Sequence, residues 1–294
     1  MNNNINVENL KSTLSKCYQF EYIDNNSDNL LISFTPNSKY FLYHSNINSN
    51  RLCLATKSIN YYLYNPASNA KKLSQFIVKS GIKNVIIIGT SKAGFASLLW
   101  GSLIQDYLKK YSEINIFILS FSPQIKLYPY NETLYFPSYK AFLSTLENDE
   151  GLRKCCELYG DVSKYLIKSQ VSGMIIYPEN NKCDKLEAYR TKGSNIILTS
   201  IPSPLHDTIF PFVMDITSTE KVKALVDKIY INSQNGPDLE ETLPKEKEDL
   251  YKILMSIKTP SLTKLCDALF FQMAHKSQLD NAIKVYQMGF MNLS

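Results

Sequence analysis

Several features that assign a protein to a class at once are scarce in this sequence. Its 294 residues include only three histidines and six cysteines. No two cysteines have the C-x-x-C spacing of a metal-binding motif, and no histidine pattern accompanies them. We therefore expect no metal site, and a chain of this length needs no disulfide framework to fold.

A strong excess of one charge is also missing. The net charge is only +5, and lysines are interleaved with acidic residues along the whole chain. This pattern is typical of a solvated surface and not of a nucleic-acid-binding face. Nucleic acid is therefore not expected among the partners of this protein.

Long apolar runs are absent too. No segment approaches about 18 consecutive apolar residues, which is close to the length that a membrane-spanning helix needs. The N-terminus reads Met1-Asn2-Asn3-Asn4 and lacks the basic and apolar regions of a signal peptide. The sequence thus predicts a cytoplasmic protein with no integral membrane segment.

Short apolar runs alternate with longer amphipathic stretches along the first 230 residues or so. The run 84–88 is apolar, β-branched and bounded by turn residues, which is typical of a strand buried on both faces. Strands are expected over 19–23, 29–35, 51–56, 84–88, 115–120, 174–177 and 195–200. Helices are expected over 66–79, 93–110, 137–170 with a break at Gly160-Asp161, 184–190 and 218–229. This order predicts an α/β fold with a doubly wound, mostly parallel sheet.

The pattern changes near residue 235. A polar, acidic linker leads to helices expected over 246–257, 261–275 and 277–288, with no strand signal. We therefore divide the chain into an α/β domain, 1–235, and a linker with a helical C-terminal extension, 236–294. Apolar residues recur at helical spacing in this extension, and such a stripe more often packs on its own domain. Self-association through these helices stays open.

The turn Gly89-Thr90-Ser91-Lys92-Ala93-Gly94 follows a buried strand and opens a helix. That is the context of a nucleophile elbow, in which a strained turn exposes a serine hydroxyl at the edge of a sheet. Small residues are needed two positions before and after the serine, and Gly89 and Ala93 meet this need, while Gly94 relieves the next contact. A plain strand-to-helix connection is the alternative. A phosphate loop is disfavoured, because the turn has neither G-x-x-x-x-G-K-[ST] nor G-x-G-x-x-G spacing.

A nucleophilic serine needs a base, and His206 is the candidate. It follows the last expected strand, in a loop that Pro202 and Pro204 hold in an irregular conformation. Where such a turn carries a nucleophile, the chain order is serine, then acid, then histidine. Nothing in the spacing around His44 and His275 suggests catalysis, so both are expected to be surface or packing residues.

The carboxylate that would orient the histidine should follow the strand before the last one. Asp184 ends that loop and is the candidate, with a role as helix cap only as the alternative. Glu179 is the substitute in the same loop. Asp207 adjoins His206 in the sequence and is expected to cap a helix instead.

Two backbone N–H groups would have to stabilise the oxyanion that forms on attack. The first is expected from Lys92, the residue after the serine. The second should come from the loop after the strand at 29–35, where Thr35 is the candidate because Pro36 has no N–H. Lys92 and Thr35 thus form the expected oxyanion hole.

Three segments carry a resemblance to a known family: Tyr61-Tyr62-Leu63-Tyr64-Asn65-Pro66, the stretch 84–96 around Ser91, and Phe121-Ser122-Pro123-Gln124. They look like a bacterial branch of the α/β-hydrolase superfamily whose members carry a G-x-S-K/M-G-G elbow. Members of this branch are often associated with surface-polysaccharide or glycoprotein pathways. The resemblance covers roughly residues 28 to 230, and Ala93 replaces the first glycine of the usual pair.

The resemblance implies that the domain 1–235 is catalytic and transfers acyl groups. Ser91, deprotonated by His206 and with Asp184 holding the imidazole, would attack an acyl carbonyl and form an acyl-enzyme. Some members resemble esterases or deacetylases acting on small-molecule or glycan esters, and others resemble capsule O-acetyltransferases with acetyl-CoA as donor substrate. No other cofactor is implied. The alternative from a different class is an inactive scaffold protein that kept the fold.

Overall fold

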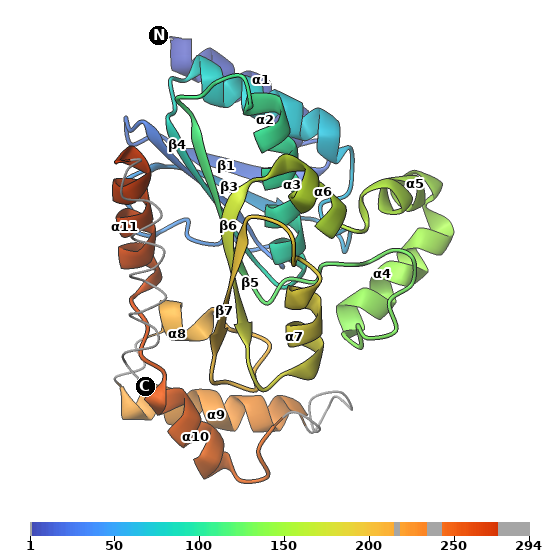
Figure 1. Ribbon diagram of the computed structural model, residues 1–294, viewed down its shortest axis with the longest axis vertical. Coiled ribbons are helices and arrows are strands. Elements are labelled where there is room, and N and C mark those ends of the chain that lie inside the picture. The colour runs from blue at the N-terminus through green and yellow to red at the C-terminus, as the bar shows by residue number, and fades with distance from the viewer. Residues whose placement is uncertain (1, 215–217, 234–242, 276–294) are drawn as a thin grey trace.

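The computed structural model describes residues 2–214, 218–233 and 243–275 (Figure 1). Its centre is a seven-stranded sheet in the order β1-β3-β2-β4-β5-β6-β7. The strands are β1 (Tyr18–Ile23), β2 (Asn29–Phe34), β3 (Asn50–Thr56), β4 (Asn84–Thr90), β5 (Asn115–Phe121), β6 (Ser172–Pro178) and β7 (Ile196–Ile201). β1 is antiparallel to β3, and all other neighbours are parallel. The predicted doubly wound, mostly parallel sheet is confirmed, and each strand ends within two residues of its predicted range.

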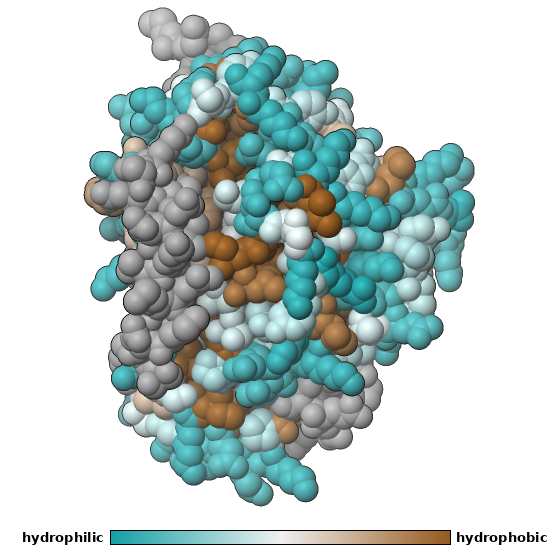
Figure 2. All heavy atoms as spheres, in the orientation of Figure 1, coloured by the Kyte–Doolittle hydropathy of each residue, from teal (hydrophilic) through white to brown (hydrophobic). Residues whose placement is uncertain are grey.

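The central strands are apolar on both faces, which is why helices cover both. In β4, Val85 and Ile87 belong to one core cluster and Ile86 and Ile88 to the other, because successive side chains alternate across a strand. The helices of the first cluster include α2 (Pro66–Lys79) and α3 (Lys92–Leu108), and those of the second include α8 (Phe210–Val213) and α11 (Leu262–Ala274). Figure 2 shows mostly hydrophilic residues over the outer helices and apolar residues gathered toward the middle of the visible face.

The helical stretch predicted over 137–170 consists of α4 (Pro137–Asn148), α5 (Glu150–Tyr159) and α6 (Ser163–Ser169). The break at Gly160-Asp161 separates α5 from α6, as predicted. A second break, at Asp149, was not predicted. The Asp149 side chain caps α5 by accepting a hydrogen bond from the Leu152 N–H at 2.8 Å. Further along, α7 (Lys182–Tyr189) connects β6 to β7.

The C-terminal helical extension is present, but its helices pack in two different ways. α10 (Lys247–Ser256) packs on α9 (Thr219–Ser233) through a small apolar cluster that includes Leu250 and Leu254. α11 instead lies along the sheet, and its Leu265 and Leu269 are buried in the same cluster as Phe117 (Figure 1). α11 is therefore part of the core of the α/β sheet. The predicted helix 277–288 and most of the predicted linker lie outside the described residues.

The N-terminal helix α1 (Asn2–Leu14) was not predicted. Its sequence is mostly polar, so it carries little apolar periodicity. Leu10 and Leu14 are nevertheless buried, and the helix packs beside α2 and β1. Tertiary contacts thus stabilise a helix that the local sequence pattern does not predict.

Candidate active site

Ser91 lies in the turn between β4 and α3, at the carboxyl end of a central strand. Its φ and ψ are 55° and −125°, and a positive φ is uncommon for a residue other than glycine. The turn is tight, because a Cβ on Gly89 would overlap the carbonyl of Ala93, and a Cβ on Gly94 would lie 2.8 Å from Ser120 Oγ. These small residues are required for the close contact of strand and helix. The turn therefore has the geometry of a nucleophile elbow.

His206 and Asp184 form a chain of hydrogen bonds with Ser91. His206 Nε2 lies 2.7 Å from Ser91 Oγ, and His206 Nδ1 lies 2.8 Å from Asp184 Oδ1. His206 comes from the loop after β7, and Asp184 from the first turn of α7. The Nδ1 atom thus bonds to Asp184 and not to the substitute Glu179 or to the neighbouring Asp207. The three side chains that the sequence singled out meet at one edge of the sheet.

Asp184 is not the cap of α7. Asn181 is the N-cap residue, and its Oδ1 accepts a hydrogen bond from the Asp184 N–H at 3.2 Å. The Asp184 side chain is buried, and its Oδ2 has no hydrogen-bond partner in the described part of the chain. The interpretation of Asp184 as a helix cap only is therefore wrong, because Asn181 takes that place.

Burial and charge act in opposite directions on the Asp184–His206 pair. Burial raises the pKa of the Asp184 carboxyl, and the neighbouring His206 offsets this only in part. Burial acts to lower the pKa of His206, but the charge and hydrogen bond of Asp184, with the charge of Asp207, outweigh it and the pKa is raised. Asp184 therefore favours the imidazolium, which is the state that the ring reaches when it takes a proton from a serine.

The two expected oxyanion donors differ in availability. Lys92 is the first residue of α3, so its N–H has no acceptor within the hydrogen-bond pattern of the helix. The Thr35 N–H donates to the Leu54 carbonyl at 3.1 Å and lies 3.2 Å from the Tyr62 hydroxyl oxygen. The assignment of Thr35 is therefore corrected. The ladder between β2 and β3 extends one residue past Phe34 and uses this N–H.

No protein-family model and no curated protein sequence matches the chain. Among solved structures, it is similar to a lipase-esterase related protein from Clostridium acetobutylicum, with 15% identity and a TM-score of 0.39 over 65% of this chain and 92% of that one. Carboxyl esterase 2 from the fungus Tuber melanosporum is 12% identical, with a TM-score of 0.44 over 63% of this chain and 70% of that one. Acetyl xylan esterase 1 from Thermoanaerobacterium is 14% identical, with a TM-score of 0.42 over 63% and 72%. A mostly parallel sheet with a strained serine turn between a central strand and a helix is the context of the nucleophile elbow known from α/β-hydrolases.

The remaining histidines have ordinary surroundings. The His44 ring meets the Tyr43 ring edge-on, with centroids 4.7 Å apart. His275 follows α11, and its Nδ1 lies 2.8 Å from the Phe271 carbonyl oxygen. These contacts agree with the surface and packing positions expected from the sequence.

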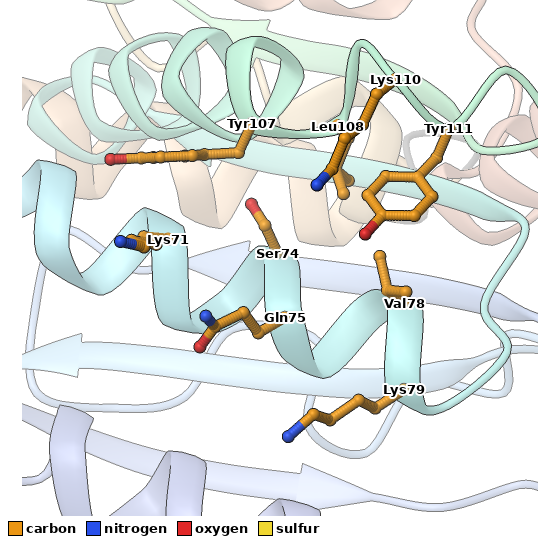
Figure 3. A pocket seen from close by; sticks show the side chains of 9 residues that line it. All are labelled: Lys71, Ser74, Gln75, Val78, Lys79, Tyr107, Leu108, Lys110 and Tyr111. Atoms are coloured by element: carbon orange, nitrogen blue, oxygen red, sulfur yellow. The ribbon is translucent and has the colours of Figure 1, made fainter.

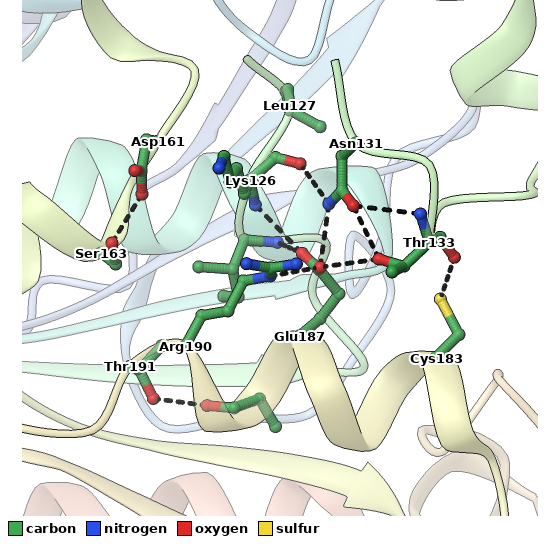
Figure 4. Close-up of polar contacts among 12 residues, drawn as sticks. Lys126, Leu127, Asn131, Thr133, Asp161, Ser163, Cys183, Glu187, Arg190 and Thr191 are labelled. Carbon is green, nitrogen blue, oxygen red and sulfur yellow. Dashed lines mark hydrogen bonds and ion pairs between the residues drawn. The ribbon is translucent and has the colours of Figure 1, made fainter. Parts of the chain in front are cut away.

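Glu187 is a buried residue that the sequence reasoning missed. It lies one turn after Asp184 on α7, and its carboxylate is surrounded by donors (Figure 4). They are the backbone N–H groups of Ile125 at 2.7 Å and Lys126 at 3.0 Å, Asn131 Nδ2 at 2.9 Å and Arg190 Nε at 2.7 Å. This network ties the loop after β5 to α7. The spacing of three residues places both carboxylates near one face of the helix, but nothing in the sequence separates a buried glutamate from an exposed one.

Gln124, in the loop after β5, is a second residue that the sequence reasoning left without a role. Its Nε2 lies 3.5 Å from Ser91 Oγ, and its Oε1 accepts a hydrogen bond from the Tyr61 hydroxyl. Gln124 and Tyr61 are both buried. They come from two of the segments that carry the resemblance, and the fold brings both to the turn at Ser91.

A cavity of about 380 Å³ lies beside His206. Its lining is largely apolar and comes from the loop after β7, α8, α9 and Leu243, and it includes His206, Asp207 and Lys228. Another hollow of about 240 Å³ lies between α2 and α3 and is lined by Lys71, Lys79 and Lys110 among others (Figure 3). Of these two hollows, the one beside His206 adjoins the hydrogen-bonded chain to Ser91.

The described residues contain no group of three or more His, Cys, Asp or Glu side chains that could hold a metal ion. None of the helices described has the length and apolar character needed to cross a membrane. The six cysteines are free thiols.

Proposed function

We propose that this protein cleaves or transfers acyl esters through a covalent acyl-enzyme on Ser91. The observation that carries the proposal is the hydrogen-bonded chain from Asp184 through His206 to Ser91, with Nε2 2.7 Å from Oγ. A base at this distance can take the serine proton as the hydroxyl attacks. The strained turn supports the same role, because it presents the hydroxyl at the edge of the sheet.

In the first half-reaction, Ser91 Oγ forms a bond to the acyl carbon and its proton passes to His206 Nε2. The electron pair of the carbonyl bond moves onto the oxygen, which accepts a hydrogen bond from the Lys92 N–H. Asp184 stabilises the imidazolium. When the carbonyl re-forms, the bond to the leaving group breaks, and this group, an alcohol from an ester or the thiol of coenzyme A from acetyl-CoA, takes the proton from His206. An acyl-serine remains.

In the second half-reaction, another hydroxyl group attacks the acyl carbon and gives its proton to His206 Nε2. The bond between the acyl carbon and Ser91 Oγ then breaks, and Oγ takes the proton back from His206. Water as the acceptor gives a carboxylic acid, and a sugar hydroxyl gives a new ester. We propose an acetylated glycan as the substrate or product, on the strength of the sequence resemblance. Acetyl-CoA would serve as donor substrate only in the transfer reaction, and no cofactor is needed for either outcome.

Labelling with a fluorophosphonate probe tests the nucleophile. The wild-type protein should be labelled, and Ser91→Ala should not be. Ser102→Ala is the matched control, because Ser102 lies on α3, is buried and has a hydroxyl without a partner in the described residues. A folded wild-type protein that resists the probe would contradict the proposal and favour the inactive scaffold.

The acceptor is tested with acetyl-CoA and candidate polysaccharides. Acetate release and acetyl transfer to sugar should be followed separately in one incubation. Acetyl esters that are cleaved without any sugar acetylation would reject the transferase. Acetylated sugar that forms only in the presence of acetyl-CoA would instead identify it.

A further inference from the structure

The loop after β5 brings a side-chain amide to the reaction centre. We propose that Gln124 is a second hydrogen-bond donor to the oxyanion formed at Ser91, and that Tyr61 orients it. The inference rests on the proposed function and deepens it. Gln124 would be a catalytic residue, since its amide touches the reacting oxygen, and Tyr61 a positioning residue.

The orientation of the Gln124 amide follows from the bond at its other end. A carboxamide has one oxygen that only accepts and one nitrogen that only donates. The Tyr61 hydroxyl donates to Oε1, so Nε2 is the atom that faces Ser91, 3.5 Å from Oγ. Because both side chains are buried, this donor is screened little by solvent and interacts strongly with a developing charge.

Tyr61 is itself held firmly. Its φ is +50° and that of Tyr62 is +60°, a conformation that bulky residues adopt only where the surrounding structure enforces it. The Tyr61 ring packs on Phe95 and Phe142, with centroids 6.0 and 4.7 Å apart. Burial raises the pKa of the Tyr61 phenol, so the hydroxyl stays protonated and can donate to Gln124.

The backbone on both sides of Gln124 is fixed as well. The Glu187 carboxylate accepts hydrogen bonds from the N–H groups of Ile125 and Lys126, the two residues that follow Gln124 in the chain. On the other side, Ser122 Oγ lies 2.8 Å from Thr208 Oγ1, in the loop that carries His206. The amide is therefore placed before any substrate arrives, which is what makes a donor effective in catalysis.

The position of Nε2 suits an oxyanion better than the resting hydroxyl. At 3.5 Å from Ser91 Oγ the contact is too long for a strong hydrogen bond. In the tetrahedral intermediate, Oγ and the oxyanion are bonded to the same carbon, so the oxyanion forms within reach of a donor placed near Oγ. The Thr35 N–H already donates to the Leu54 carbonyl. The oxyanion therefore needs a second donor beside the Lys92 N–H.

Steady-state hydrolysis of p-nitrophenyl acetate tests the proposal. Gln124→Met keeps the length of the side chain and removes the donor, so kcat should fall by roughly 100-fold with KM unchanged. The affinity for phenylboronic acid, which forms a tetrahedral adduct on a serine, should fall in parallel. Tyr61→Phe should lower kcat by less, because the amide remains but is no longer oriented. Tyr64→Phe is the matched control, since its hydroxyl bonds to Asp149 at 2.6 Å, and it should keep the wild-type kcat.

The possible failures are distinguishable. If the wild-type protein neither reacts with a fluorophosphonate nor hydrolyses the ester, the proposed function and the role of Gln124 both fall. If the wild type is active and Gln124→Met keeps its kcat and boronic acid affinity, only the role of Gln124 falls. If Gln124→Met does not fold, Tyr61→Phe decides, and a kcat equal to that of Tyr64→Phe overturns the proposal.

Discussion

Two buried carboxylates lie one turn apart on α7 and differ in how completely their oxygens are bonded. Glu187 accepts hydrogen bonds from two backbone N–H groups, an amide and a guanidinium (Figure 4). Asp184 bonds to His206 through Oδ1, while Oδ2 has no partner among the described residues. A saturated buried carboxylate holds structure together, whereas an undersatisfied one costs stability and calls for an explanation by function. Glu187 therefore stabilises the fold, and Asp184 acts on His206.

The largest effect is expected for Asp184→Asn. The amide does not supply the charge that stabilises the imidazolium and can hold the wrong tautomer, so kcat for p-nitrophenyl acetate should fall roughly 10⁴-fold. The melting temperature should change little, because α7 keeps its Asn181 cap and Oδ2 loses no partner. Kinetics and thermal unfolding of the same sample measure both. An Asp184→Asn protein with wild-type kcat would contradict the catalytic role of Asp184.

The next largest effect is expected for Glu187→Ala. This change leaves the Ile125 and Lys126 N–H groups and Arg190 without their acceptor, and the free energy of unfolding should fall by about 3 kcal/mol. Urea denaturation measures it. Glu150→Ala is the matched control, because the Glu150–Lys154 ion pair is mostly exposed and such pairs contribute little. Equal stability of the two variants would show that the network does not hold the loop to α7.

The same two residues show which parts of the site could be predicted from the sequence. Asp184 was found because the order of serine, acid and histidine after successive strands is a property of chain order. Glu187 was not found, because its role depends on which backbone groups the fold brings to it. The prediction that the Thr35 N–H is an oxyanion donor was wrong for a related reason. Whether its N–H is free depends on the register of β2 against β3, which the sequence does not reveal.

The fold follows the same division. The strands were predicted because buried parallel strands have short, β-branched sequences between turn residues, as in 84–88. The helix α1 was missed because it has few apolar residues and is stabilised by contacts with α2 and β1. The packing of α11 on the sheet was not specified either, since an apolar stripe predicts burial but not the surface that covers it.

The smallest expected effect is a shift in the pKa of His206, and it follows from the same pair. The pKa of His206 is raised because the charge and hydrogen bond of Asp184 outweigh burial, which alone would lower it. A base must be neutral to act, so kcat/KM should rise with pH and level off only above this raised pKa. In Asp184→Asn the negative charge that raises the pKa of His206 is absent, while burial still lowers it. The pKa of His206 should therefore be lower than in the wild type. Glu187→Ala should leave it in place.

NMR titration of the histidine rings measures this pKa even where activity is lost. The chain has only three histidines, so the His206 signal can be assigned by its loss in a single variant. The His44 and His275 signals serve as internal references, since neither ring contacts Asp184 in the described structure. The same His206 pKa in the wild type and in Asp184→Asn would mean that the undersatisfied carboxylate does not act through this ring. The contrast between the two carboxylates of α7 would then be one of packing alone.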